Sequence, residues 1–300
     1  AEIAKQGFNP LEERQKERPY QREGDPLPQN NEERRLNKFT RAWLADKQVQ
    51  ALKAWHSNVP HAAALGYLTN PFTSGIIVDK KGNPLPTTPE TAAHLRFVDD
   101  AVAIRDRAVA MQFIAEDHLS RTEKDQEVNW VSLASGTAEP SIIASKKTMD
   151  ATGAKINLTV VDYDATALEF VERNAQHHSF EGKVEPIVQD ILSPDYPDKI
   201  EDATGITDGF DVVENMGFEE YLPQEGDELG AYRDMEFLPQ ASDFTANAWK
   251  LVKPGGVLIS GNMIVDRPQI GFVFGVVGWP IINARSDASI LRVYEKAGIL

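Results

Sequence analysis

The second half of this 300-residue chain alternates short apolar segments with stretches of helical character, and this alternation is the feature that most constrains its fold. Segments of strand length occur at residues 129–134, 156–161, 184–188, 210–213 and 257–260, and helical stretches at 139–150, 165–177 and 242–251. Parallel strands need crossover connections, which helices supply. The sequence therefore predicts an α/β fold with a doubly wound, mostly parallel sheet.

The first 124 residues follow a different pattern and predict an N-terminal helical appendage. Residues 1–30 are rich in charge, Gln, Asn and Pro, which is typical of an extended arm. Residues 31–124 contain one amphipathic helical pattern and, after a segment interrupted by Pro and Gly, a second helix from residue 88 to about 119. We interpret 31–124 as a lid or substrate region and 125–300 as a cofactor-binding domain.

The second helix of this appendage is expected to bury one apolar stripe. Its apolar residues recur at helical spacings and are Leu95, Val98, Val102, Val109 and Phe113. A helix before the first strand of an α/β domain can cover a ligand pocket, so contacts with the substrate are expected from this region, with Trp55, His61 and Tyr67 as candidates. The apolar run 270–282 is a further candidate for the wall of that pocket.

Charge and composition limit the partners of the protein. Lys plus Arg total 31 and Asp plus Glu total 46, which gives a formal net charge of −15. Nucleic acid is not expected, because phosphate backbones bind surfaces of the opposite sign. The chain has no Cys, which excludes thiolate metal sites and cysteine nucleophiles, and no metal site is predicted. Run 270–282 is shorter than the ~20 residues that span a bilayer, and no leader is visible, so we expect a cytoplasmic protein without membrane contact.

Small and acidic residues follow the predicted strands at the points where each strand ends. Small side chains at Ala134, Ser135, Gly136 and Ala138 allow a sharp turn after the first strand and close approach of a ligand. This turn lacks the G-x-G-x-x-G pattern, which weakens a dinucleotide interpretation. In an open parallel sheet, ligands bind beyond the carboxyl ends of the strands, so we predict a ligand site at this edge.

Two acids at the ends of the second and third strands are candidates for holding a nucleoside. Asp162 can accept hydrogen bonds from two ribose hydroxyls, because a carboxylate offers only acceptors. Asp190 can accept from an exocyclic adenine amine, although a solvated loop acid is the alternative. Asp164 stands where the next helix needs an N-cap, and capping is the favoured interpretation for it.

Residues 128–262 resemble the core of class I S-adenosylmethionine-dependent methyltransferases. The resemblance rests on VSLASGTAEP at the first turn, LTVVDYDATALEFVERNA at the second strand and helix, VQDIL after the third strand, GFDVVENMGFEEYL around the fourth and LVKPGGVLISGN at the fifth. It implies S-adenosyl-L-methionine as cofactor. The implied contacts are Ala134, Ser135, Gly136 and Ala138 beside the methionine part, Asp162 on the ribose with Tyr163 next to it, and Asp190 with Ile191 on the adenine.

The chain differs from the family pattern at three places. Ser132 stands where the family usually has an acid at the end of the first strand, and Ala134 and Ala138 stand where glycines are expected. Alanine fits these two positions without strain if their backbone is right-handed or extended. A helical pattern at 289–297 stands where the family usually continues into a final antiparallel pair of strands. We therefore expect the sheet to lack them, and favour a shortened chain over a sheet that is finished differently.

Methyl transfer from a sulfonium is a direct displacement, for which a protein mainly aligns the reactants and excludes water. A hydroxyl or protonated amine acceptor also needs a base. Glu214 is the first candidate, with Asn215 and Tyr221 as orienting groups. His177 and His178 lie at a predicted helix end and are interpreted as structural.

We therefore predict a methyltransferase that acts on a small-molecule acceptor and leave the oligomeric state open. The alternatives are a nicotinamide-dependent oxidoreductase and a module that binds S-adenosylmethionine without catalysis.

Overall fold

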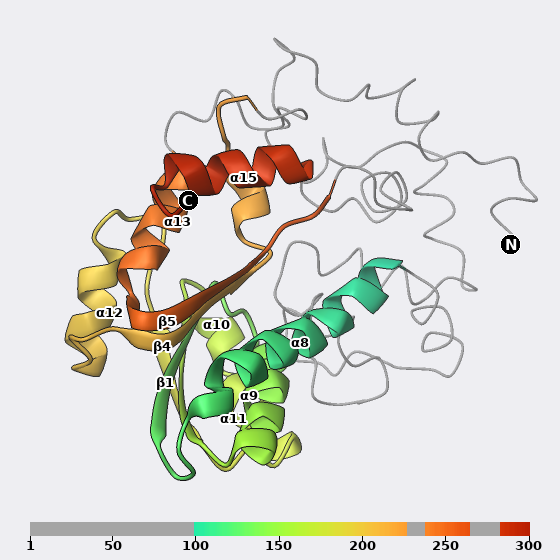
Figure 1. The fold of residues 1–300 in the computed structure, drawn as a ribbon, viewed down its shortest axis with the longest axis vertical. Helices are drawn as coiled ribbons and strands as arrows, with labels where there is room; N and C mark the ends of the chain where they lie inside the picture. The colour runs from blue at the N-terminus through green and yellow to red at the C-terminus, as the bar shows by residue number, and fades with distance from the viewer. Residues whose placement is uncertain (1–98, 227–237, 265–282) are drawn as a thin grey trace, which may run out of the picture.

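The computed structural model describes residues 99–226, 238–264 and 283–300 and contains a five-stranded sheet in which each pairing is parallel (Figure 1). The strands are β1 (Glu127–Leu133), β2 (Lys155–Asp162), β3 (Lys183–Val188), β4 (Phe210–Met216) and β5 (Val252–Gly261). Their order across the sheet is β3-β2-β1-β4-β5. The chain therefore adds β2 and β3 on one side of β1 and then adds β4 and β5 on the other side. The predicted doubly wound α/β fold is confirmed.

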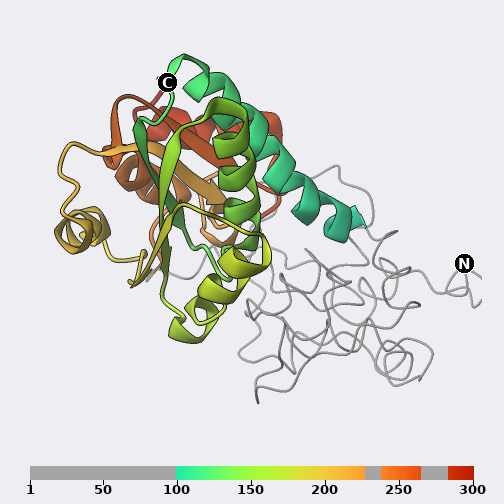
Figure 2. The same cartoon turned by 90° about the horizontal axis from the view of Figure 1, so that it is seen from below.

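Helices cover both faces of this sheet (Figures 1 and 2). One face carries α8 (Asp99–His118), α9 (Glu139–Thr152), α10 (Ala165–Leu168) and α11 (Val171–His177). The other carries α12 (Tyr196–Thr204), α13 (Ala241–Lys250) and α15 (Asp287–Lys296). Two short 3-10 turns complete the elements, η2 (Leu119–Arg121) after α8 and η3 (Glu219–Tyr221) after β4.

The core consists of two clusters of buried apolar side chains, one on each face of the sheet. Trp130 of β1 packs with Met111 of α8 and Ile142 of α9 in the first cluster. In the second, Val213 of β4 packs with residues of α12 and α13, and Phe244 stacks on Tyr196 with ring centroids 5.8 Å apart. Because successive side chains of a strand point to opposite faces, residues 132, 214 and 216 belong to the α8–α9 face.

Three local features differ from the prediction. The helix expected at 165–177 is divided into α10 and α11, because the backbone N–H of Phe170 bonds to Ala167 O and the last turn of α10 tightens. The strand expected at 257–260 already begins at Val252, and the Pro-Gly-Gly turn lies inside β5 where its pairing with β4 shifts register. Helix α12, whose first turn contains a proline, is not among the helices that the sequence pattern predicts.

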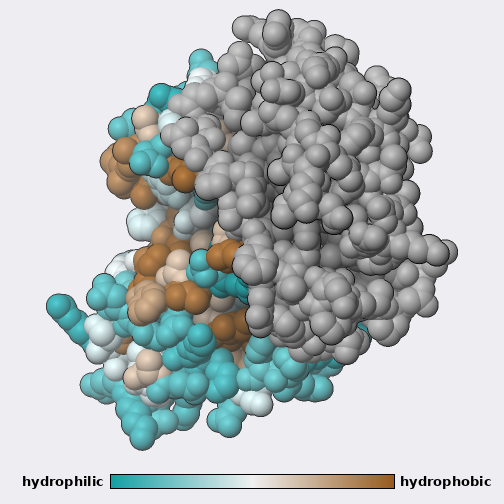
Figure 3. Space-filling view, turned by 90° about the vertical axis from the view of Figure 1, so that its right-hand side faces the viewer, coloured by the Kyte–Doolittle hydropathy of each residue, from teal (hydrophilic) through white to brown (hydrophobic). Residues whose placement is uncertain are grey.

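The buried stripe predicted for the helix before β1 is wrong in the part that the structure describes. Val102, Val109 and Phe113 are 36%, 39% and 64% exposed. The side of α8 that faces α9 instead carries Ile104, Ala108, Met111 and Ala115, which are buried. The small side chains of alanine allow two helices to pack closely, so the side of α8 that carries Ala108 and Ala115 is buried and the side with the larger apolar residues is exposed. Figure 3 shows apolar side chains gathered on one side of the described surface.

Several predictions fall outside the described residues. These are the arm at 1–30, Leu95, Val98, the candidate substrate contacts Trp55, His61 and Tyr67, and the apolar run 270–282. The division into three regions stays a prediction, although α8 packs directly on α9 and β5. After β5 the described chain ends with α15, as expected. None of the helices in the described ranges has the length and apolar character that crossing a membrane requires.

Candidate functional site

The turn after β1 and the ends of β2 and β3 lie together at one edge of the sheet. The backbone N–H of Ser135 donates to Val161 O over 3.0 Å, and that of Gly136 donates to Asp162 Oδ2 over 2.7 Å. The N–H of Gln189, just after β3, donates to Asp162 O over 3.0 Å. The three segments that the sequence analysis assigned to a cofactor therefore converge on Asp162.

The turn itself contains three residues with left-handed backbone. The φ angles are 52° at Ala134, 55° at Gly136 and 54° at Ala138. The condition for unstrained alanines is thus not met, because a Cβ in this region costs roughly 1–2 kcal/mol per residue. Strained conformations persist only where surrounding structure fixes them.

Helix α11 supplies contacts that fix the turn. Asn174 Nδ2 donates to Thr137 O over 2.9 Å. One turn later on the same helix, His178 Nε2 lies 2.8 Å from Glu139 Oε1, at the start of α9. His178 therefore has a structural partner, which agrees with the interpretation from sequence.

Asp162 is a buried carboxyl group at the centre of this edge. Burial raises its pKa, and the backbone N–H donors of Asp164 and Gly136 act in the opposite direction. Each of its oxygens accepts one backbone N–H, from Asp164 at 2.9 Å and from Gly136 at 2.7 Å. A carboxylate has about four acceptor positions, so Asp162 retains capacity to accept from a hydroxyl group of a ligand.

The neighbours of Asp162 differ in their exposure. Tyr163 is 75% exposed and presents an aromatic ring to solvent beside the carboxyl group. Asp164 caps α10, accepting from Thr166 N at 2.9 Å, as predicted.

The two candidates after β3 also differ. Asp190 is exposed, and its Oδ1 accepts the N–H of Leu192 at 2.9 Å. Ile191 is only 5% exposed and packs in the core with Val161 and Leu133, and its contact with an adenine stays a prediction.

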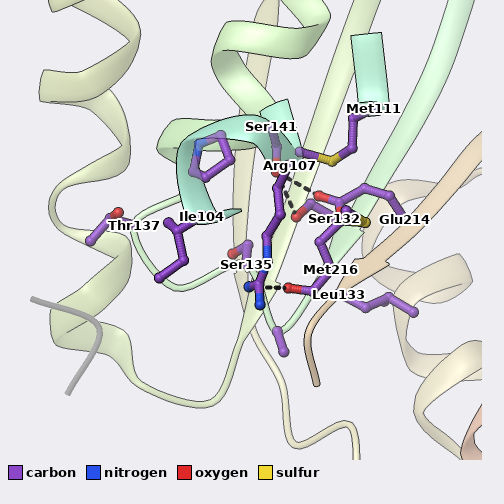
Figure 4. Close-up of a pocket in the computed structure, with 12 residues that line it drawn as sticks. Ile104, Arg107, Met111, Ser132, Leu133, Ser135, Thr137, Ser141, Glu214 and Met216 are labelled. Atoms are coloured by element: carbon purple, nitrogen blue, oxygen red, sulfur yellow. Dashed lines mark hydrogen bonds between the residues drawn. The ribbon is translucent and has the colours of Figure 1, made fainter. Parts of the chain in front are cut away.

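A small cavity of about 50 Å³ lies between the turn, α8 and β4 (Figure 4). Its lining includes Ser132, Ser135, Ser141, Arg107 and Glu214. Ser135 Oγ is shielded from solvent and has no hydrogen-bond partner among the described residues. The cavity thus combines one carboxyl group, one guanidinium group and an unsatisfied hydroxyl.

Glu214 is the carboxyl group of this cavity and is 2% exposed. Ser141 Oγ donates to Glu214 Oε1 over 2.5 Å, and the Ser132 hydroxyl lies against the same carboxyl group. Burial raises the pKa of Glu214, while the two hydroxyls, the Met216 N–H and the Arg107 charge lower it.

Ser132 and Glu214 are register partners on the neighbouring strands β1 and β4. The acid that the family pattern places at residue 132 is absent, but β4 brings a carboxyl group next to that position from the adjacent strand.

Arg107 is a functional candidate that sequence reasoning missed. It reaches from α8 to the end of β4, where its Nη1 donates to Met216 O over 2.9 Å and its Nη2 lies 3.7 Å from Glu220 Oε1. Gly217 makes this possible, because a Cβ there would come within 2.6 Å of Arg107 Nη1. An arginine among the many polar residues of a helix gives no sequence signal; the glycine after β4 was the only local hint.

The structure does not bring the three candidate catalytic residues into one place. Asn215 is fully buried on the opposite face of β4, where its amide lies beside Glu219. Tyr221 lies in η3, with its ring 6.4 Å from that of Phe218. Of the three, Glu214 alone lines the described cavity.

A second group of buried charges follows β4 on the opposite face and was also missed. Arg285 Nη1 donates to Glu219 O over 2.9 Å and to Asn262 Oδ1 over 2.8 Å, and its Nη2 donates to Leu222 O over 2.7 Å. Glu219 Oε1 accepts from Thr245 Oγ1 at 2.7 Å. Burial raises the pKa of Glu219, against the opposing effect of the Thr245 hydroxyl.

Glu220 completes this group on the side of the cavity. Its Oε2 accepts the N–H of Met263 at 2.7 Å, and burial raises its pKa although the charge of Arg107 lowers it. Within the described ranges, no three His, Asp or Glu side chains are arranged as metal ligands.

Comparison with known proteins gives information about the fold. No protein-family model and no curated protein matches the sequence. A solved structure described as a possible exported protein from Bordetella parapertussis is 17% identical, covers 86% of this chain and 89% of its own, and has a TM-score of 0.55.

Two further solved structures are similar at lower TM-scores. The CMeT domain of the citrinin polyketide synthase is 14% identical, with 86% of this chain and 62% of that chain covered and a TM-score of 0.49. Geranyl diphosphate methyltransferase in complex with SAM is 15% identical, with 71% of each chain covered and a TM-score of 0.41. At these identities the likeness concerns the fold.

Proposed function

We propose that this chain, which has the class I methyltransferase fold, binds S-adenosyl-L-methionine at the carboxyl edge of its sheet and transfers the methyl group to a small molecule. The observation that supports this most is the hydrogen bond between Gly136 N–H and Asp162, which joins the small-residue turn to the acid after β2. The resemblance of residues 128–262 to the family assigns these two places to one cofactor, and the hydrogen bond joins them directly.

The residues at this edge fit the chemical groups of the cofactor. Asp162 would accept hydrogen bonds from the ribose hydroxyls with its remaining lone pairs. Tyr163 offers an exposed ring on which an adenine could stack, and Asp190 offers an exposed acceptor. The side chain of Ile191 would support this cofactor site by packing in the apolar core beneath it.

The cavity fits the amino-acid end of the same molecule. At about 50 Å³ it has room for a small polar group rather than a nucleoside. Glu214 would pair with an ammonium group and Arg107 with a carboxylate, and Ser135 Oγ would gain a partner. Such paired, charge-assisted contacts in a buried site give strong orientation.

When bound, the cofactor supplies an electrophilic methyl group on a sulfonium. The chain would hold the cofactor in one orientation, exclude water and position the acceptor, and alignment of this kind can contribute ~7–11 kcal/mol to a reaction. Glu214 could also accept a proton from the acceptor. The hydroxyl groups of Ser132 and Ser141 would then hydrogen-bond to the same carboxyl group as the substrate.

Isothermal titration of the intact chain with S-adenosylmethionine tests the proposal. Asp162→Ala should weaken binding roughly ten- to a hundredfold through loss of charged hydrogen bonds. Asp164→Ala is a matched control, because that carboxylate caps α10 instead. Absence of binding by the folded intact chain, or equal losses in both variants, would refute the proposal.

A second candidate is a module that binds the cofactor without catalysis. It is supported by the separation of the three candidate catalytic residues, of which only Glu214 lines the cavity. Cofactor binding together with absence of methyl transfer to hydroxyl, amine, carboxylate and carbon acceptors would favour this module over the enzyme.

A further inference from the structure

Glu214 differs from the other buried carboxyl groups in lining a cavity without a cation in hydrogen-bond contact. In the described part of the chain, β1 and α9 face it with the hydroxyls of Ser132 and Ser141. Its register partner on β5 is the apolar Ile259. The charge that acts on it from α8 is that of Arg107, whose guanidinium bonds to Met216 O instead.

The charges around the end of β4 do not balance. Among the residues that the structure describes, three buried carboxyl groups, those of Glu214, Glu219 and Glu220, occur with two guanidinium groups, those of Arg107 and Arg285. Arg285 is bonded to carbonyl oxygens near Glu219, and Arg107 lies 3.7 Å from Glu220. An unpaired charge excluded from water is strongly unfavourable, so one carboxyl group must hold a proton or meet a cation from outside.

Glu214 is the group that an external cation can reach. Glu219 is engaged by Thr245 Oγ1, and Glu220 by the N–H of Met263. Neither lines the cavity, whereas Glu214 does. Burial raises the pKa of Glu214, as expected of an acid that lacks a counter-charge.

The proposed cofactor and its product differ in charge. S-adenosylmethionine carries a sulfonium, an ammonium and a carboxylate and is a net cation, whereas its demethylated product has lost the sulfonium charge and is neutral overall. We infer that Glu214 gives this site a preference for the cationic cofactor over the neutral product, by releasing its proton when the cofactor binds. This inference rests on the proposed function.

The exchange balances over a catalytic cycle. On binding, the O–H bond of the Glu214 carboxyl group breaks, the proton goes to solvent and the ligand's positive charge takes its place. The cofactor would supply a methyl group whose C–S bonding electron pair stays on sulfur, and the acceptor would form the new bond to that methyl group and release its own proton to solvent. The product keeps its ammonium group but has lost the sulfonium charge, so Glu214 faces one positive charge fewer and takes a proton from solvent as the product leaves.

Calorimetric titrations of the intact chain between pH 5 and pH 8, in buffers of different ionisation enthalpy, measure this proton release directly. We expect up to one proton released for each S-adenosylmethionine bound, and fewer with S-adenosylhomocysteine. Because the ligand favours the ionised form, affinity for S-adenosylmethionine should rise with pH by up to about tenfold per unit until Glu214 is ionised without ligand.

Three glutamates provide the matched variants. Glu214→Gln should abolish the proton release and reduce the preference for the cofactor over the product by roughly ten- to a hundredfold, as expected for one charge a few ångströms from another. Glu219→Gln, outside the cavity, and Glu127→Gln, at the opposite edge of the sheet, should retain both properties.

Ser141→Ala gives a second test that does not depend on how well Glu214→Gln folds. Removal of a hydroxyl that stabilises the ionised form should extend proton release to higher pH. Circular dichroism would verify that each variant is folded.

The outcomes separate the two proposals. Binding of S-adenosylmethionine without proton release, or an unchanged release in Glu214→Gln, overturns the inference and leaves the proposed function intact. Loss of proton release in Glu219→Gln would instead assign the proton to the other face of β4 and also overturn it. Failure of the folded intact chain to bind either ligand would overturn the proposed function itself.

Discussion

The carboxyl ends of the parallel strands form one edge of the sheet, and the part of this edge around β1 and β2 is built differently from the part around β4. Around β1 and β2, backbone N–H groups and left-handed residues close in sequence make the turn, and the bond that joins it to Asp162 spans 26 residues. Around β4, buried charges from distant parts of the chain meet, with Arg107 and Met216 separated by 109 residues and Arg285 and Glu219 by 66. The structure of the β1–β2 half therefore depends on backbone conformation, and the structure of the β4 half depends on the balance of its buried charges.

This difference separates the expected effects of mutation. In the β1–β2 half, a changed side chain alters strain or one cap, and the cost is limited to about 1 kcal/mol. In the β4 half, a removed partner leaves a charge or several carbonyl groups unsatisfied in the interior, which costs several times more. The change in the free energy of unfolding caused by each substitution allows the two halves to be compared.

The largest effect is expected for Arg285→Met. This variant removes hydrogen bonds to two carbonyl oxygens and the positive charge that acts on Glu219, whereas Glu220 still has Arg107 at 3.7 Å. We expect a loss of about 3–5 kcal/mol in the free energy of unfolding, measured with urea. Arg121→Met, at an exposed site, is the control. A loss under about 1 kcal/mol would show that the buried charges do not control this half.

The next effect is a pH dependence in Glu219→Gln. Because burial raises the pKa of Glu219 above its ordinary value of 4.5, the contribution of this group to stability is complete below pH 4.5 and decreases as the pH rises through the folded-state pKa. The variant lacks this decrease, so its unfolding free energy relative to the intact chain should rise by up to about 1.4 kcal/mol per pH unit.

Urea unfolding at a series of pH values measures this difference, with Glu181→Gln at an exposed position as the control. A difference between Glu219→Gln and the intact chain that does not change with pH would contradict the assignment.

A smaller effect is expected for Asp164→Ala in the other half. The variant removes the cap of α10, in which the carboxylate accepts from the N–H and the hydroxyl of Thr166. The expected loss is about 1 kcal/mol in the urea unfolding free energy. Asp164→Asn should retain most of it, since Asn is an equally good cap. A loss as large as that of Arg285→Met would remove the contrast between the two halves.

The smallest effect has the opposite sign. Ala134→Gly and Ala138→Gly should each stabilise the chain by about 0.5–1 kcal/mol, because relief of left-handed strain exceeds the added entropy of the unfolded chain. Ala110→Gly, at an exposed position inside α8, should instead destabilise by about 1 kcal/mol. Differential scanning calorimetry of the three variants would show whether the alanines carry strain.

The same contrast explains which features could be predicted from the sequence. Strand positions, the cap at Asp164 and the convergence of the turn on Asp162 follow from local patterns and from the rule that parallel strands end at one edge. Arg107 and Arg285 could not be found in this way, because their partners lie far away in sequence. The stripe of α8 was misassigned for a related reason: apolar residues occur around the helix, and only the partner helix α9 determines which side is buried.

The register between β1 and β4 has a consequence for how proteins of this kind are found. Ser132 and Glu214 occupy adjacent places on two strands, so an acidic group can move from one strand to the other during evolution and stay at the same point in space. A search pattern written along a single strand counts such a chain as having lost the residue. A pattern written across paired strands would count it as present.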